Sequence, residues 1–150
     1  SLLEKTREIN QIIQKAAGHP ISFAEMADTL CRNIHSNIYI IGRKGKVLGY
    51  CFMDNFYCPT MEEIVKQEAH FPEQYNEDLL RTQEIKVNID RHNQCVFSTE
   101  TACILPQKFT TVIPIVGGGQ RLGTLMLSKS GEFDDNDLIL AEYGATVIGM

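Results

Sequence analysis

Three cations stand close together between two apolar runs of the chain. Arg43, Lys44 and Lys46 share a five-residue segment with Gly42 and Gly45. Cationic side chains on a flexible backbone are suited to contact a phosphate group. A solvated hairpin turn has the same composition, because charges gather at exposed turns. Both interpretations place the segment at a turn, and both stay open at this point.

A second group of candidate residues is apolar and follows about fifteen positions later. Thr60 is the predicted N-cap of a short helix, because a glutamate follows it three residues on, and Met61 and Ile64 give this helix an apolar side. Phe71 comes next, with Pro72 at the predicted first position of another helix. These apolar residues are either plain core or the lining of a pocket for an apolar ligand.

Other motifs do not assemble a reactive site. The glycine-rich segment 118–124 imitates a phosphate-binding loop, but it lacks the lysine and runs into a strand. His92 and Cys95 have ligand-like spacing without a second pair, so no metal site is predicted. Ser22 and Asp134 are better explained as helix caps than as parts of a catalytic triad. We therefore predict no catalytic residues and no enzyme.

The bulk properties indicate one domain over residues 1–150. With 150 residues and 43% hydrophobic side chains, the chain is long enough for a real core. The formal charge of −5 argues against nucleic-acid binding by this segment itself. Five cysteines are a poor match to a disulfide framework and favour a reducing cytoplasm. No signal peptide and no run of membrane-spanning length is present, so no membrane partner is expected.

The element order predicts an α+β domain with an antiparallel sheet. A hairpin spans Thr110–Leu127, and its nearly continuous apolar arms place it in the middle of the sheet under a helix. The last helix begins at Asp134 and has two apolar stripes, so it needs the sheet and the first helix as neighbours. Its pattern runs to Met150, which predicts further protein beyond that residue. The other predicted elements are helices over 2–17 and 22–34, a hairpin over 37–52, two short helices from 60 and 72, and a strand over 95–97. Residues 82–93 are predicted as a polar loop with room for one edge strand.

This arrangement looks like the sensor domains of the GAF and PAS kind, in which a ligand pocket lies between the sheet and short helices. Five ordered blocks carry a closer resemblance: LLEKTREIN, SNIYIIGRKGKVLGY, FPEQY, TTVIPIVGGGQRLGTLML and FDDNDLILAEYGATVIGM. Together they resemble the N-terminal GAF domain of the CodY family, global transcriptional repressors of low-GC Gram-positive bacteria. The resemblance implies a homodimer with branched-chain amino acids as effectors, isoleucine above all. It also implies GTP as a second effector, and DNA binding through a C-terminal winged helix-turn-helix that this chain lacks.

Carried over by position, the resemblance implies a set of residues that line the amino-acid pocket. An aliphatic side chain would be enclosed by apolar residues, and the ammonium would be held by backbone groups. The implied ligand-binding residues are Thr60, Met61, Ile64, Phe71, Pro72, Tyr75, Cys95, Phe97, Ser98 and Thr99. For GTP, the resemblance implies contacts from Arg43, Lys44 and Lys46.

One departure from the family pattern bears on affinity. Thr60 stands where well-studied members have an arginine that grips the ligand carboxylate. A charge-assisted bidentate contact contributes about 1.5–3 kcal/mol, so its loss predicts binding weaker by tenfold or more. Backbone N–H groups at the start of a helix beginning at Thr60 can bind the ligand carboxylate in place of that arginine. Ser98 and Thr99 replace a proline and an apolar residue, which predicts a more polar pocket.

Two classes of function follow. The first is a sensor domain that binds a small amino acid and passes the signal to a DNA-binding domain. The second is a dimerisation or interaction module whose pocket is filled by its own side chains. Ligand-dependent thermal stabilisation separates the two, because a ligand that prefers the folded state raises the unfolding midpoint.

Overall fold

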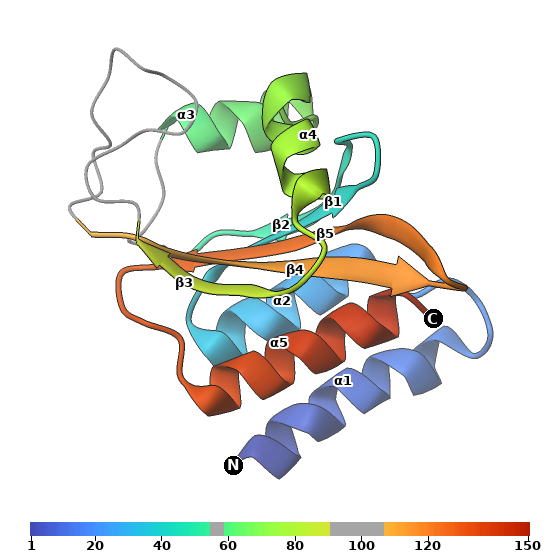
Figure 1. Cartoon of the computed structure of the whole chain (residues 1–150). Coiled ribbons are helices and arrows are strands. Elements are labelled where there is room, and N and C mark those ends of the chain that lie inside the picture. Colours follow the sequence, from blue (N-terminus) through green and yellow to red (C-terminus); the bar gives the residue numbers. More distant parts are fainter. Residues whose placement is uncertain (55–58, 91–106) are drawn as a thin grey trace.

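The computed structural model describes residues 1–54, 59–90 and 107–150. In these ranges the strands form one sheet with the order β2-β1-β5-β4-β3, and every neighbouring pair is antiparallel. Long helices lie on one face and short helices on the other (Figure 1). The predicted α+β class is confirmed. In chain order the elements are α1 (Leu2–Ala16), α2 (Phe23–Ile34), β1 (Asn37–Gly42), β2 (Val47–Cys51), α3 (Pro59–Glu62), η1 (Glu63–Glu68), α4 (Glu73–Arg81), β3 (Lys86–Asp90), β4 (Phe109–Gly117), β5 (Gln120–Lys129) and α5 (Asp135–Ile148).

The hairpin of β4 and β5 forms the middle of the sheet, as predicted. β5 is the central strand and pairs with β1 on its other side. Gly118 and Gly119 make the turn with φ angles of 58° and 76°. Two consecutive positive φ values are typical of a type I′ turn, whose twist matches that of the two strands, and glycine adopts such values without strain. The glycines of this segment therefore serve a hairpin.

The long helices lie on one side of the sheet: α2 and α5 pack against its strands, and α1 packs on α2 and α5 (Figure 1). Local signals set where they begin: the Ser22 hydroxyl accepts a hydrogen bond from the Glu25 N–H at 3.1 Å, and Asp134 and Asp137 form a reciprocal capping box. α5 packs against β4 and also against α1 and α2. Its wide apolar face thus has the sheet and two helices as neighbours, one more helix than predicted.

The end of α5 differs from the prediction. The helix stops at Ile148, and Gly149 is its C-cap, donating its N–H to the Ala145 carbonyl. Helical structure therefore does not reach Met150, because Gly149 ends the helix. No helix among the described residues is long and apolar enough to cross a membrane.

The short elements on the opposite face correct two predicted boundaries. The first short helix begins at Pro59, so Thr60 lies within its first turn and is not the N-cap. The chain then continues as a π-helix, η1, which closes at Ala69 with a φ of 54°. Pro72 is the N-cap of α4 and not its first helical residue. The predicted edge strand within 82–93 is β3, whereas the predicted strand over 95–97 lies outside the described residues.

Candidate functional site

A second apolar cluster lies between the sheet and the short helices, on the opposite face from the main core. It is separate from the core beneath α1, α2 and α5. We call it the short-helix cluster. Its buried members are Tyr39, Ile41, Met61, Ile64, Val65, Phe71, Leu79, Val112 and Met126, and Val47, Phe52, Tyr75 and Ile89 pack against it half-buried.

The floor of the short-helix cluster is a row of side chains across three strands. Tyr39 of β1 is paired with Met126 of β5, and Met126 is paired with Val112 of β4. Residues paired in this way point to the same face of a sheet. The row was not predicted as part of the site, although all three residues contact the predicted ones through this cluster.

The roof comes from helical residues at positions 61, 64 and 65. Met61, Ile64 and Val65 are at most 7% exposed, and their spacing turns all three toward the sheet. The last two lie on η1. A π-helix is rare and is found frequently at functional sites, because its extra residue per turn re-aims side chains. This local irregularity, adjacent to the predicted ligand residues, marks the face as a candidate site.

Aromatic rings fill the centre of the cluster. The Phe71 side chain is fully buried, and its ring centroid lies 6.2 Å from that of Tyr39 and 5.7 Å from that of Tyr75. The Tyr75 hydroxyl donates to the Met126 sulfur at 3.3 Å. Edge-to-face and tilted contacts of this kind stabilise a packed apolar site by about 0.5–1.5 kcal/mol per pair. The site is therefore an apolar enclosure with a hydroxyl at its margin.

Arg121 fixes α4 above the sheet, a role that the sequence did not indicate. Its guanidinium donates to the carbonyls of Leu79 at 3.1 Å and Thr82 at 2.8 Å, which belong to the end of α4. It also donates to the Gly123 carbonyl at 2.6 Å and the Thr124 hydroxyl at 3.0 Å, on β5. Burial lowers the pKa of this guanidinium, and its donors add hydrogen bonds to carbonyls at the C-terminal end of α4.

The cationic turn between β1 and β2 is hydrogen-bonded to the same short helices. The Phe71 N–H donates to the Gly45 carbonyl at 2.9 Å, and the Asn76 side-chain amide donates to the Arg43 carbonyl at 3.0 Å. Lys46 pairs with His70 through a β-bridge. Phe71 thus contacts the turn with its main chain and the short-helix cluster with its ring.

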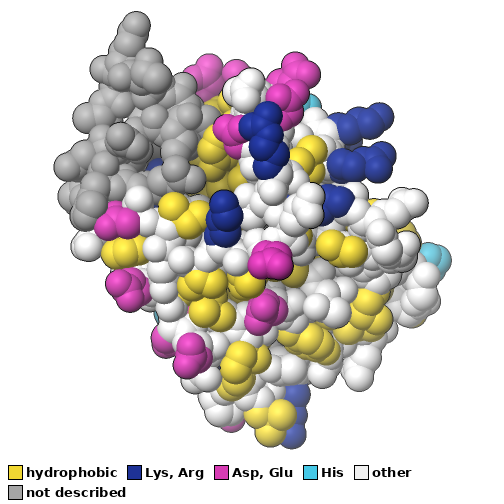
Figure 2. Space-filling view, in the orientation of Figure 1, with side chains coloured by type: hydrophobic (Ala, Val, Ile, Leu, Met, Phe, Trp, Pro, Cys, Tyr) yellow, Lys and Arg dark blue, Asp and Glu magenta, His cyan; other side chains and the backbone are white. Residues whose placement is uncertain are grey.

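The charges of this turn point outward. Arg43, Lys44 and Lys46 are all exposed, and Figure 2 shows Lys and Arg side chains gathered at this corner of the molecule. Gly45 is buried with a φ of 95°, and a Cβ there would lie 2.8 Å from the His70 ring. The turn therefore requires glycine at this position and presents its three cations to solvent.

The predicted ligand residues divide into three groups. Met61, Ile64 and Phe71 come together in the short-helix cluster, and Tyr75 packs against it half-buried. Thr60 and Pro72 are exposed at the starts of the short helices. The predictions for Cys95, Phe97, Ser98 and Thr99 lie outside the described residues.

Comparisons with known proteins agree on one family. The model of the CodY GAF-like domain matches residues 1–150. The global transcriptional regulator CodY of Clostridium kluyveri is 46% identical over 151 residues, covering 100% of this chain and 58% of that protein. CodY of Lysinibacillus sphaericus is 49% identical over 152 residues, again covering 100% of this chain and 58% of the relative. The chain therefore spans somewhat more than half the length of these curated relatives.

Solved structures agree with the fold. The cofactor-binding GAF domain of the nutrient sensor CodY from Clostridium difficile has 38% sequence identity and a TM-score of 0.70, covering 99% of this chain and 95% of that one. A GAF domain/HD domain protein from Geobacter sulfurreducens has a TM-score of 0.54 with 14% identity, covering 99% and 95%. The second likeness concerns the fold alone.

Proposed function

Since this chain belongs to the CodY GAF-like domain family, we propose that it is the effector-sensing domain of a transcriptional repressor and binds a branched-chain amino acid. The effector is isoleucine, leucine or valine, and it is held at the short-helix cluster. The observation that carries the proposal is this second apolar cluster, enclosed by short helices on the face opposite the main core.

The chemistry of the cluster supports an aliphatic ligand. Met61, Ile64 and Phe71 offer thioether, alkyl and aromatic surface, which suits a branched side chain. The structural relative from Clostridium difficile is described as cofactor-binding and as a nutrient sensor, which supports a small effector at the same fold. Such a domain has no need of a catalytic residue.

The contacts that this protein offers to the carboxylate of the amino acid are weaker than those of the well-studied family members. Thr60 is exposed and brings no charge, and the first residue of α3, Pro59, has no N–H to offer. We therefore propose that affinity for the amino acid is reduced. Submicromolar binding of isoleucine, leucine and valine alike would contradict this part of the proposal.

The regulatory output belongs to the longer protein. The chain covers 58% of the length of its curated relative from Clostridium kluyveri, which is a transcriptional regulator. We propose a homodimer in the cytoplasm, whose DNA contacts come from a C-terminal domain outside residues 1–150. Effector binding under α3, η1 and α4 controls that domain.

The cationic turn is the proposed contact for GTP. Arg43, Lys44 and Lys46 are exposed and sit on a backbone fixed by Phe71 and Asn76, so their charges are presented from a stable base. Replacing Lys44 and Lys46 by alanine is expected to weaken GTP binding by the full-length protein. Unchanged GTP affinity in that double variant would contradict the assignment.

The second candidate function is an interaction module with a self-filled pocket. The observation in its favour is that protein atoms alone bury Phe71 and Tyr39 to at most 1% exposure. In that case the short-helix cluster is ordinary core, and its face serves dimerisation.

Calorimetric titration with isoleucine, leucine and valine tests the proposal, with alanine as the control ligand. The proposal expects heat of binding for at least one branched amino acid and a raised unfolding midpoint at saturation. Neither effect with any of the three, in protein shown to be folded, would favour the interaction module.

A further inference from the structure

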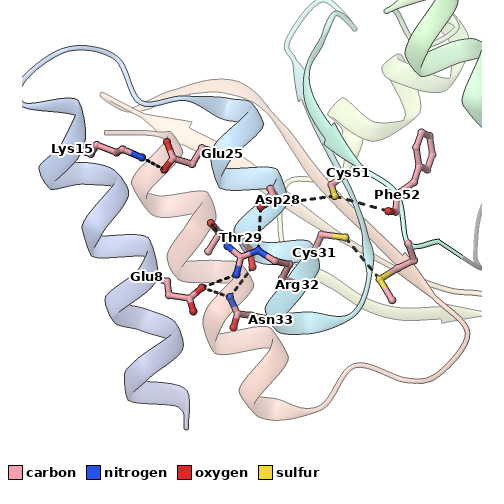
Figure 3. A network of polar contacts seen from close by, with 11 residues as sticks. Glu8, Lys15, Glu25, Asp28, Thr29, Cys31, Arg32, Asn33, Cys51 and Phe52 are labelled. Atoms are coloured by element: carbon pink, nitrogen blue, oxygen red, sulfur yellow. Dashed lines mark hydrogen bonds and ion pairs between the residues drawn. The ribbon is translucent and has the colours of Figure 1, made fainter.

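Three sulfur atoms lie side by side between α2 and β2, away from the short-helix cluster. Cys31 is on α2 and only 4% exposed, Cys51 ends β2, and Met53 follows it, both half-buried. The Cys31 and Met53 sulfurs are 3.9 Å apart, and the Cys51 thiol on the facing strand lies close enough to the Cys31 thiol to interact with it. Figure 3 shows both cysteines directed into the space between helix and strand.

The sulfur separation suits a metal better than a direct bond. A metal–thiolate bond is about 2.3 Å long, so two sulfurs around a trigonal metal lie about 4.0 Å apart. A disulfide requires sulfurs about 2.05 Å apart. The 3.9 Å between Cys31 and Met53 therefore already matches one edge of a trigonal three-sulfur site.

We propose that Cys31, Cys51 and Met53 bind a soft monovalent metal cation, copper(I) being the expected ion. Thiolate and thioether ligands select such ions, whereas magnesium and calcium prefer oxygen. Within residues 1–54, 59–90 and 107–150, no three His, Cys, Asp or Glu side chains are grouped to hold a metal. The thioether of Met53 completes the set, and it points to a soft ion rather than zinc.

The charges around the sulfurs favour a cation. The Asp28 carboxylate lies 3.9 Å from the Cys51 sulfur. The negative charge of this carboxylate favours a cation beside the sulfur, and each thiol that coordinates the ion releases its proton.

The backbone holds the three ligands in place without a metal. The Met53 N–H donates to the Asn37 side-chain oxygen at 2.6 Å, and Cys51 is paired with Ile38 in the sheet. Gly49 allows α2 to press on β2, because a Cβ there would lie 2.7 Å from the Phe23 carbonyl oxygen. The donors are thus preorganised, which reduces the cost of ordering them when the ion binds.

Titration of the reduced protein with copper(I), in competition with a chromophoric copper(I) chelator, tests the site. Silver(I) in chloride-free buffer is a second probe that needs no reductant. We expect one tightly bound equivalent, and an affinity lower by at least about tenfold in Cys31→Ser, Cys51→Ser and Met53→Leu. Met150→Leu is the matched control, because it removes an exposed thioether at the end of the chain and should leave that equivalent unchanged.

Met53→Leu is the decisive variant, because it keeps the side-chain volume and removes only the sulfur. Unfolding midpoints of the metal-free variants establish that each is folded. Wild-type copper(I) affinity in Met53→Leu, or equal loss in Met150→Leu, would overturn the proposal. So would zinc(II) binding at the same residues with the affinity of copper(I).

Discussion

Replacing Arg121 by methionine should loosen α4 from the sheet and weaken effector binding at the same time. Methionine keeps an unbranched side chain of similar reach but supplies no donors. The change leaves the carbonyls at the end of α4 and two acceptors on β5 without the guanidinium. Phe71 precedes α4 and Tyr75 lies on it, so both side chains would then lose their fixed position over the sheet.

The structure sets the size of the effect. Four of the hydrogen bonds are 3.1 Å or shorter, and a fifth, to the Leu80 carbonyl, is 3.4 Å. At about 1 kcal/mol net for each of the shorter bonds, the loss is about 4 kcal/mol. Removing a partly buried charge returns about 1 kcal/mol of its burial penalty. We therefore expect the free energy of unfolding to fall by about 3 kcal/mol.

Urea unfolding followed by circular dichroism measures this loss, and calorimetry with isoleucine measures the second effect. Arg7→Met, an exposed arginine of α1, is the matched control and should change the free energy of unfolding by no more than about 0.5 kcal/mol. If Arg121→Met unfolds at the same urea concentration as Arg7→Met, the assigned role of Arg121 is wrong.

The remaining predictions concern the carboxylate grip, the cationic turn and the Cys31 thiol. Thr60→Arg should raise isoleucine affinity by about tenfold in calorimetry, whereas unchanged affinity would show that position 60 does not face the ligand carboxylate. Gly45→Ala should lower the free energy of unfolding by about 1–2 kcal/mol because φ is 95° there; Gly131→Ala, with open space around it, should be nearly neutral, and equal effects would contradict the argument. Cys31 keeps its proton in the folded state up to a pKa of about 12, against 9.0 when unfolded, so stability should fall as pH rises above about 9. Urea unfolding at pH 9 and 10 should show a decrease larger in wild type than in Cys31→Ala by about 1 kcal/mol, and parallel curves would refute it.

Most elements were predictable because their signals are local. Ser22 and Asp134 mark helix starts by residue type and spacing alone, and both act as caps in the structure. The turn at Gly118 and Gly119 follows from glycine's access to positive φ. These signals need no knowledge of the rest of the chain, so the sheet and the long helices could be placed from them.

The site was only partly predictable, because its geometry depends on distant contacts. β1 is apolar on both faces, so no alternation reveals that Tyr39 faces the short helices while Ile40 faces the long ones. The first short helix was predicted to begin after Thr60 but begins at Pro59, and no sequence pattern indicates the π-helix that follows it. The role of Arg121 was not predictable, because the carbonyls that accept its hydrogen bonds lie about forty residues earlier in the chain.

The chain's five methionines allow the central claim to be tested directly, since they report on different parts of the molecule. Met61 and Met126 belong to the short-helix cluster, whereas Met26 lies in the main core and Met150 is 85% exposed. In protein labelled with 13C at the methionine methyl groups, isoleucine should shift the NMR signals of Met61 and Met126 and leave those of Met26 and Met150 in place. Shifts confined to Met26, or no shift at saturating isoleucine, would contradict a ligand site beneath the short helices.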